Sequence, residues 1–312
     1  MLIAESNEFS PRAIQMLQSE FEVRAADANR EELVGAIADV EVLWVRLRNM
    51  IDKQILDLAP KLKAIATNTT GLNHIDLDEA AKRNIAVVSL KGESEFLSDI
   101  RATAEHTIGL ALALLRKIPT AHQHASAGGW DRYPFKGHEL YEQTVGIIGY
   151  GRLGKIVAQY CLAFGMQILV SDPHVTDTDG LTRVELAELV NQSDVISLHV
   201  DYCPENHQMI DRSVFDQCKP GAIFINTARG ELVNESDLLA ALSSGKLAGA
   251  ALDVVSEEHK TTDTFKALVE YAAQHDNLIL TPHIGGNTFE SHYKTEDFLA
   301  NKVLSLFQNQ NK

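Results

Sequence analysis

A glycine-rich turn between an apolar strand and a helix constrains the fold of this chain more than any other feature. Residues Val145–Ile148 form a short apolar run, and a helical pattern follows over Leu153–Phe164. Three glycines with the spacing G-x-G-x-x-G join the two: Gly149, Gly151 and Gly154. A second apolar run then ends in Asp172. This order of strand, glycine turn, helix and strand predicts a βαβ unit over residues 144–172 that binds a dinucleotide.

Each glycine of the turn has a separate physical task. Gly149 permits the tight turn, Gly151 lets a pyrophosphate approach the backbone, and Gly154 lets the helix pack closely on the strand. The N–H groups of Arg152 and Leu153 open the helix, where the positive end of its dipole favours phosphate. We therefore expect these five residues to bind the cofactor.

Asp172 indicates which dinucleotide is bound. A carboxylate at the end of the second strand can accept hydrogen bonds from the ribose hydroxyls of adenosine. The same charge would repel a 2′-phosphate, and the following Pro173 and His174 supply no arginine to hold one. The expected cofactor is NAD rather than NADP.

Short apolar strands alternate with amphipathic helices in two separate stretches, residues 1–98 and the region after Thr144. Such alternation predicts a parallel sheet covered by helices in each stretch. A chain of 312 residues is also long for a single core. We predict an α/β fold with two doubly wound parallel-sheet lobes. A strongly apolar helix over residues 102–117 should be buried between lobes or between subunits.

Composition excludes several classes of function. The formal net charge of −15 disfavours nucleic acid as a partner, because an acidic surface repels phosphate backbones. No apolar run is long enough to cross a membrane, and the N-terminal residues lack the pattern of a signal peptide. Three cysteines, odd in number and without metal-type spacing, predict reduced thiols in a cytoplasmic protein and no metal site: Cys161, Cys203 and Cys218.

Three strands of the second stretch run into polar residues: Arg229, Glu258 and His283. The carboxyl ends of parallel strands share one edge, where the ligand crevice of an open sheet lies. A planar guanidinium can bind a carboxylate and polarise a carbonyl. An imidazole can exchange a proton with an alkoxide, and a neighbouring carboxylate would stabilise its protonated form. The sequence therefore predicts hydride transfer to or from a 2-oxo acid.

Motifs across nearly the whole chain resemble the D-isomer-specific 2-hydroxyacid dehydrogenase family, which includes phosphoglycerate dehydrogenases. The matching segments occur in the family's order: Thr70–Asp76, Ala104–His106, Gly128–Trp130, Gly149–Gly154, Ser197–Val200, Asn226–Gly230, Gly249–Val254 and Thr281–Gly286. The resemblance implies an NAD-binding Rossmann domain, residues 99–287, inserted in a flavodoxin-like substrate-binding domain made of residues 1–98 and 288–312. It also implies a homodimer built around the long apolar helix.

The resemblance also assigns roles to single residues. It implies Arg229, Glu258 and His283 as the catalytic triad, and a contact of Asp253 with the nicotinamide carboxamide. The substrate carboxylate would be bound by three backbone groups: Thr70, Gly71 and Leu72. Further cofactor contacts would come from residues at the ends of three strands: His199, Val200, Thr227, Ala228, Gly285 and Gly286.

This chain departs from the family pattern at two places. Proline usually follows the catalytic glutamate, and here His259 does, so the choice of Glu258 over Glu257 rests on its spacing from Asp253. The family's Pro-Leu-Thr after the position of Val200 is replaced by Asp-Tyr-Cys, which affects the expected contacts on the adenine side.

The substrate and one functional alternative remain open from the sequence. Arg46 follows the third strand, where a phosphoglycerate dehydrogenase would contact the substrate phosphate; Arg48 is nearby, and an exposed loop arginine is equally consistent. The candidates are 3-phosphoglycerate, hydroxypyruvate, glyoxylate or a similar acid. The alternative is an NADH-sensing binding protein or co-repressor with the same fold and little turnover. Such a protein would bind NADH tightly without turning over substrate.

Overall fold

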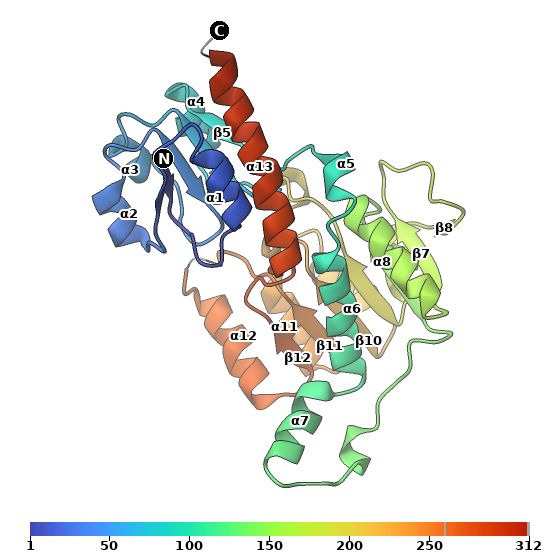
Figure 1. Ribbon diagram of the computed structural model, residues 1–312. Coiled ribbons are helices and arrows are strands. Elements are labelled where there is room, and N and C mark those ends of the chain that lie inside the picture. Colours follow the sequence, from blue (N-terminus) through green and yellow to red (C-terminus); the bar gives the residue numbers. More distant parts are fainter. Residues whose placement is uncertain (259, 311–312) are drawn as a thin grey trace. The chain divides into compact units, whose positions relative to one another are not determined.

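Two compact units make up the computed structural model, which describes residues 1–258 and 260–310 (Figure 1). One unit joins Met1–Ile100 to Asn287–Lys312, and the other is Arg101–Gly286. Each unit contains one parallel sheet, of five strands in the first and seven in the second. The predicted α/β fold with two doubly wound parallel-sheet lobes is confirmed.

The first unit has the strand order β2-β1-β3-β4-β5, which is the flavodoxin-like order. Its strands are β1 (Leu2–Ile3), β2 (Arg24–Ala25), β3 (Val42–Val45), β4 (Ala64–Thr67) and β5 (Ala86–Val88). Its helices are α1 (Pro11–Leu17), α2 (Arg30–Ala36), α3 (Lys53–Asp57), α4 (Leu77–Lys82), α5 (Ser94–Leu97) and α13 (Phe289–Gln310).

Both faces of this sheet are buried, because alternate strand residues point to opposite sides. On one face Leu43 and Ile65 pack with residues of α2, α3 and α4. On the other face Trp44 packs with residues of α1 and with Leu299 and Val303 of α13. Figure 1 shows α13 beside α1, so the end of the described chain completes a core that its beginning starts.

The second unit has the strand order β12-β11-β10-β9-β6-β7-β8. The chain adds β7 and β8 on one side of β6 and then returns to add β9 to β12 on its other side, so the strand order reverses between β6 and β9. Its strands are β6 (Thr144–Ile148), β7 (Gln167–Ser171), β8 (Thr182–Arg183), β9 (Val195–Leu198), β10 (Ala222–Asn226), β11 (Leu247–Leu252) and β12 (Leu278–Leu280). Its helices are α6 (Ala102–Leu115), α7 (Ile118–Ser126), α8 (Arg152–Ala163), α9 (Leu186–Gln192), α10 (Arg212–Gln217), α11 (Glu235–Ser243) and α12 (Asp263–Gln274).

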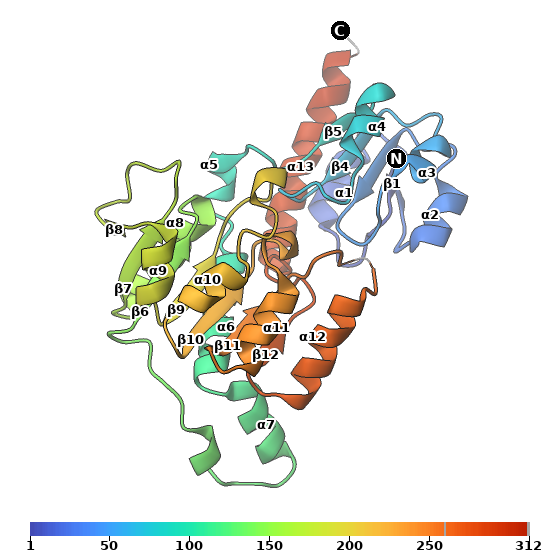
Figure 2. The same cartoon turned by 180° about the vertical axis from the view of Figure 1, so that it is seen from behind.

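Helices cover both faces of the second sheet as well. Residues of α6 and α8 pack on one face, and residues of α9, α10, α11 and α12 pack on the other, which Figure 2 shows from behind. The apolar helix α6 therefore buries Leu110 and Ala111 against the sheet of its own unit. This packing explains the apolar residues on the sheet-facing side of α6, without the expected burial between lobes or subunits.

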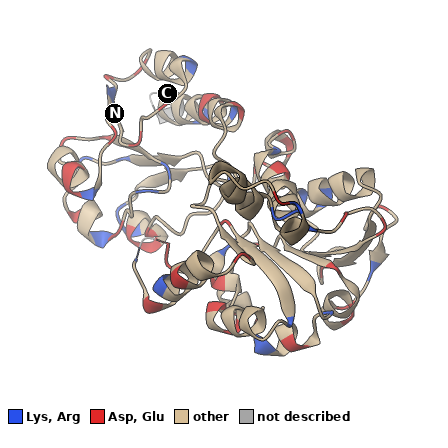
Figure 3. Ribbon diagram, turned by 90° about the horizontal axis from the view of Figure 1, so that it is seen from below, with Lys and Arg blue, Asp and Glu red and all other residues tan. Residues whose placement is uncertain are grey.

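Charged residues lie mainly on the helices and loops, and acidic positions are spread over both units (Figure 3). This distribution agrees with the net charge of −15, because the strands are buried on both faces. Among the described residues, no helix is long and apolar enough to cross a membrane.

Candidate active site

The strands β10, β11 and β12 end level with one another, because Asn226 pairs with Leu252 and Leu252 with Leu280. The predicted catalytic residues Arg229, Glu258 and His283 follow these three ends in the same order of strands. Parallel strands with aligned ends place the loops that follow them at one edge of the sheet. The structure therefore brings the loops of the predicted triad to one edge within the second unit.

His283 and Glu258 form the central pair of this edge. The imidazole Nδ1 lies 2.7 Å from Glu258 Oε2, and the side chains are 26% and 24% exposed. Glu257 directs its carboxylate to Lys260 instead, so Glu258 is the one of the two glutamates that contacts His283. His259, which stands where the family has proline, lies outside the described residues.

Arg229 is placed by the loop that follows β10. Asn226 is 1% exposed, and its side-chain amide donates to the Arg229 carbonyl at 2.8 Å and accepts from the Ala228 N–H at 2.9 Å. Arg229 Nη1 donates to the Ala228 carbonyl at 2.5 Å. Asn226 thus fixes the turn that carries the guanidinium, a role that the sequence reasoning did not give it.

Gly230 brings the Arg229 loop against the segment that leads to Glu258. A Cβ atom built on Gly230 would fall onto the backbone of Val255 and Ser256, well inside the 3.0 Å that such atoms keep from other heavy atoms. Glycine is required here because the two backbones touch.

Asp253 organises the loop that carries His283. Its carboxylate, 2% exposed, accepts hydrogen bonds from Thr281 Oγ1 at 2.6 Å, the Ile284 N–H at 2.9 Å and the Gly285 N–H at 2.7 Å. His283 itself has a φ of +53° and donates its N–H to the Asp253 carbonyl at 2.8 Å. This left-handed conformation is uncommon for a residue other than glycine, and the loop around Asp253 holds it.

His106 of α6 also contacts Asp253. The imidazole Nε2 is 3.2 Å from Asp253 Oδ1 and 3.1 Å from Thr281 Oγ1. Burial alone would raise the pKa of Asp253, but hydrogen bonds from His106, Thr281 and the backbone outweigh it and hold the pKa below its usual value. His106 lies in a matched motif of the sequence, yet no pattern there indicated its partner.

The glycine turn lies at the end of β6, at the point where the strand order reverses. Gly149 has a φ of +88°, and a Cβ there would approach the His199 carbonyl oxygen to 2.6 Å. A Cβ on Gly154 would fall onto the Gly149 carbonyl oxygen, whereas nothing lies within 4 Å of one on Gly151. The turn therefore closes tightly on the strand side and is open at Gly151.

The N-cap residue of α8 is Gly151, and among the described residues no side chain forms a capping hydrogen bond there. The N–H groups of its first turn thus begin at the open side of the glycine turn, where phosphate binding uses them. Asp172, at the end of β7, accepts hydrogen bonds from the Tyr150 and His174 N–H groups, each at 2.8 Å. One bond to each oxygen fixes the carboxylate and leaves lone pairs for hydroxyl donors. These residues fit the diphosphate and ribose of a dinucleotide.

The other predicted cofactor residues follow the ends of three strands at the same edge: His199, Val200, Thr227, Ala228, Gly285 and Gly286. Burial lowers the pKa of His199 to about 4, so its imidazole is neutral at pH 7. Its Nε2 is 2.8 Å from Ser197 Oγ. Thr227 Oγ1 is 2.8 Å from Thr107 Oγ1 of α6, which ties this loop to the helix.

Arg46 of the first unit is already paired. Its Nη2 and Nε lie 2.6 Å and 3.2 Å from Glu296 Oε1, and its Nη1 donates to the Asn7 carbonyl at 3.0 Å. Glu296 is fully buried in α13. Arg48 donates to Asp27 at 2.8 Å on the exposed surface. Both arginines considered for a substrate phosphate therefore have carboxylate partners within their own unit.

The loop after β4 presents backbone donors. Within the described part of the chain, the N–H groups of Thr70, Gly71 and Leu72 donate to no protein acceptor. The loop is fixed by Thr69, whose hydroxyl donates to the Gly71 carbonyl at 2.8 Å and whose carbonyl accepts the Leu90 N–H. Three adjacent N–H groups of this kind suit a carboxylate ligand.

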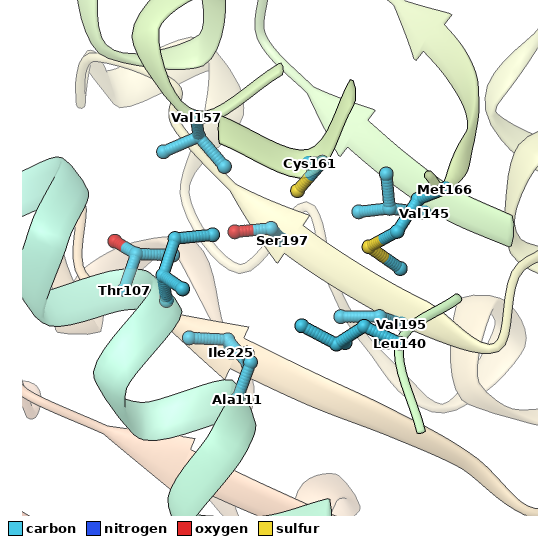
Figure 4. A pocket seen from close by; sticks show the side chains of 11 residues that line it. Thr107, Ala111, Leu140, Val145, Val157, Cys161, Met166, Val195, Ser197 and Ile225 are labelled. Carbon is cyan, nitrogen blue, oxygen red and sulfur yellow. The ribbon is translucent and has the colours of Figure 1, made fainter. Parts of the chain in front are cut away.

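A separate small pocket lies between the second sheet and helices α6 and α8 (Figure 4). Its lining is apolar apart from Thr107, Ser197 and Cys161. Burial raises the pKa of the Cys161 thiol to about 12, so the thiol is unreactive. This pocket belongs to the hydrophobic core. In residues 1–258 and 260–310, no group of His, Cys, Asp and Glu side chains could hold a metal ion.

An open parallel sheet with a glycine turn at its point of strand reversal defines a dinucleotide-binding α/β protein. The chain belongs to the D-isomer specific 2-hydroxyacid dehydrogenase family, whose NAD binding domain matches residues 108–285. The predicted family and the predicted cofactor, NAD, are confirmed by this match.

Relatives with assigned names cover most of the chain. A D-3-phosphoglycerate dehydrogenase of Mycobacterium tuberculosis is 34% identical over 308 residues, which are 97% of this chain and 56% of that protein. A hydroxypyruvate reductase of Thermotoga maritima is 35% identical over 289 residues, 92% of each chain. The chain thus spans little more than half the length of the phosphoglycerate dehydrogenases that it matches.

Solved structures share the whole fold. The D-lactate dehydrogenase from Aquifex aeolicus complexed with NAD and lactic acid has a TM-score of 0.85 and 30% sequence identity. The similarity covers 99% of this chain and 95% of that one.

Proposed function

We propose that this chain is an NAD-dependent dehydrogenase that transfers a hydride between nicotinamide and a small D-2-hydroxy acid or its 2-oxo acid. The observation that carries the proposal is the 2.7 Å pairing of His283 Nδ1 with Glu258 Oε2, on an edge shared with the Arg229 loop. When bound, NAD supplies the hydride chemistry itself. The protein's part is to bind and orient the acid and to move one proton.

His283 is the proposed proton donor and acceptor. Its Nδ1 is occupied by Glu258, so the proton exchanged with the substrate oxygen is carried by Nε2. The Glu258 carboxylate orients the ring and stabilises the imidazolium that forms when a hydroxy acid is oxidised. Positioned acid–base catalysis of this kind contributes about 10²–10⁴-fold in rate.

Arg229 is the proposed group that binds the substrate's carboxylate and carbonyl. Only Nη1 donates within the described part of the chain, to the Ala228 carbonyl, so the remaining N–H groups can form a bidentate pair. The positive charge polarises the carbonyl and raises its reactivity toward hydride.

The N–H groups of Thr70, Gly71 and Leu72 are also proposed to bind a substrate carboxylate. The proposed cofactor contacts follow the fit of the glycine turn: the diphosphate at Gly151 and the first turn of α8, and the adenosine ribose at Asp172. Asp172 also supports the preference for NAD over NADP, because its charge would lie against a 2′-phosphate.

Within the substrate class, we favour a 2-oxo acid without a phosphate, such as hydroxypyruvate or glyoxylate. The pairing of Arg46 with the buried Glu296 supports this choice, since a substrate phosphate would have to displace that carboxylate. The second candidate is 3-phosphoglycerate, which the name of the M. tuberculosis relative favours. It requires Arg46 to leave Glu296.

A panel assay tests the proposed activity. NADH absorbance is followed with glyoxylate, hydroxypyruvate, pyruvate and 3-phosphohydroxypyruvate for wild type, His283→Ala and the matched control His275→Ala. His275 is exposed and stacks on Tyr271 of α12. We expect turnover by wild type and the control, and a loss of about 10²-fold or more in His283→Ala. Tight NADH binding without turnover of any acid would instead favour the NADH-sensing binding protein.

We also propose a homodimer in the cytoplasm. Helix α7 has no buried residue, and the segment around it exposes large apolar side chains: Ile118 at 51%, Trp130 at 95% and Tyr133 at 75%. Exposed apolar surface of this kind supports a protein partner, and a second copy of this chain is the occupant proposed. Light scattering of Trp130→Asp beside wild type tests the proposed dimer, with a shift to monomer expected.

The free thiols of Cys161, Cys203 and Cys218 support the proposed cytoplasmic location, because thiols stay reduced in such a compartment.

A further inference from the structure

Glu235 is a buried carboxyl group that the proposed chemistry does not use. It is the first residue of α11 and is 5% exposed. Its Oε1 accepts the N–H of Ser256 at 2.7 Å. In the described part of the chain it forms no ion pair. Burial of a carboxyl group without a cation costs free energy, so we expect such a group to have a structural or functional role.

The partner of Glu235 lies two residues before Glu258. After Asp253 the chain leaves the sheet, passes over Gly230 at Val255 and Ser256, and reaches Glu258. Within residues 1–258 and 260–310, two hydrogen bonds tie residues 254–258 to another element. One is the bond of Glu258 to His283, and the other is the bond of Ser256 to Glu235.

The first turn of α11, which carries Glu235, is anchored in the second unit. Leu238 of the same helix is fully buried in the core of the second sheet. The Asn234 N–H donates to the Ile210 carbonyl at 2.9 Å, and the Asn234 side chain caps the helix by accepting the Asp237 N–H. The position of Glu235 Oε1 is therefore set by the core, and it can hold the more exposed segment that carries Glu258.

We propose that Glu235 is a positioning residue, whose acceptor oxygen holds Ser256 and thereby sets the place from which Glu258 orients His283. This inference rests on the proposed dehydrogenase function. Glu235 acts through Glu258, and it needs reach and an acceptor oxygen, not a negative charge. Burial raises the pKa of Glu235 to about 7, although the Ser256 bond lowers it and Glu231 adds to the rise. Both protonation states keep an oxygen that accepts the Ser256 N–H.

Two conservative variants separate reach from charge. Glu235→Gln keeps the length and the oxygen but removes the charge, so kcat should stay within about threefold of wild type. Glu235→Asp keeps the charge but shortens the side chain, so kcat should fall about 10-fold or more, as expected when a catalytic group is misplaced by about 1 Å. The KM for NADH should change little in both variants. The matched control is Asp237→Ala, since Asp237 on the same helix accepts a backbone N–H, that of Arg212, away from the Glu258 segment.

A double-mutant cycle identifies the route of the effect. In the Glu258→Ala background, Glu235→Asp should cost less than about twofold in kcat, because the group that it positions is gone. Losses that multiply in the double variant would overturn the proposal. So would a Glu235→Asp variant with wild-type kcat, or a Glu235→Gln variant as slow as Glu235→Asp.

Hydrogen exchange of the peptide over residues 254–258 provides a readout without turnover. Exchange should be faster than wild type in Glu235→Asp and unchanged in Glu235→Gln; equal exchange in all three proteins would overturn the positioning role. If wild type turns over no acid, the dehydrogenase function fails by itself, and the exchange experiment still decides whether Glu235 holds the segment.

Discussion

Gly230 is the place where the backbone that carries Arg229 touches the backbone that leads to Glu258. In Gly230→Ala the new Cβ would fall on the Val255 carbonyl carbon and the Ser256 nitrogen. To reach the 3.4 Å of ordinary contact, the two segments must part by about 1.5 Å. The bond between Glu258 Oε2 and His283 Nδ1 is 2.7 Å long, so a displacement of this size breaks it.

The expected result is a loss in kcat of about 10²-fold, the scale reported for a misplacement of about 1 Å. Steady-state NADH oxidation with the best acid of the panel measures kcat, and NADH fluorescence measures cofactor affinity, which should be retained. Gly35→Ala is the matched control, because nothing lies within 4 Å of a Cβ there and Gly35 is in helix α2. A Gly230→Ala enzyme with kcat within twofold of wild type would refute the idea that this contact sets the Glu258–His283 geometry.

Three further predictions concern charge and cofactor choice. Arg46→Ala should lower the free energy of unfolding by about 3 kcal/mol in a urea titration, because Glu296, 0% exposed, is left without its cation. Asp172→Asn should lower the ratio of kcat/KM for NADH to that for NADPH at least about 10-fold, since the charge that repels the 2′-phosphate is removed. Burial raises the pKa of Glu235 from 4.5 to about 7, so the folded protein keeps a proton that the unfolded chain releases. That stabilisation is complete below pH 4.5 and is lost as the pH rises through 7; wild type should therefore lose stability relative to Glu235→Gln between pH 5 and pH 8.

The sheets were predictable because parallel strands buried on both faces appear as short apolar runs in the sequence. The run over residues 222–227, for example, is β10 (Ala222–Asn226), one residue shorter at its end. The small edge strand β8 and helices α5, α7, α9, α10 and α12 were not identified. Strand β8 and helices α5, α9 and α10 are seven residues or shorter, whereas α12 is amphipathic and its helical pattern was overlooked. The placement of the Arg229, Glu258 and His283 loops at one edge was predictable, because parallel strands have their carboxyl ends at the same edge of the sheet.

The contacts that position those residues could not be read from the sequence. The bond of His106 to Asp253 joins a helix to a strand end far along the chain. The sequence marks Glu235 only as an acidic residue in the first turn of a helix, which is a common pattern. The sequence did not indicate a partner for Arg46, because Glu296 lies 250 positions later. Each of these contacts joins residues that are distant in the sequence, so no local sequence pattern predicts it.

The packing of α13 beside α1 has a consequence for biosynthesis. Residues 101–286 leave the ribosome before α13 does, so the second unit can fold while the first still lacks Leu299 and Val303 in its core. Until α13 arrives, Arg46 also has no Glu296. During translation the nascent first unit therefore exposes an apolar sheet face, and this is the stage at which chaperone binding would protect it.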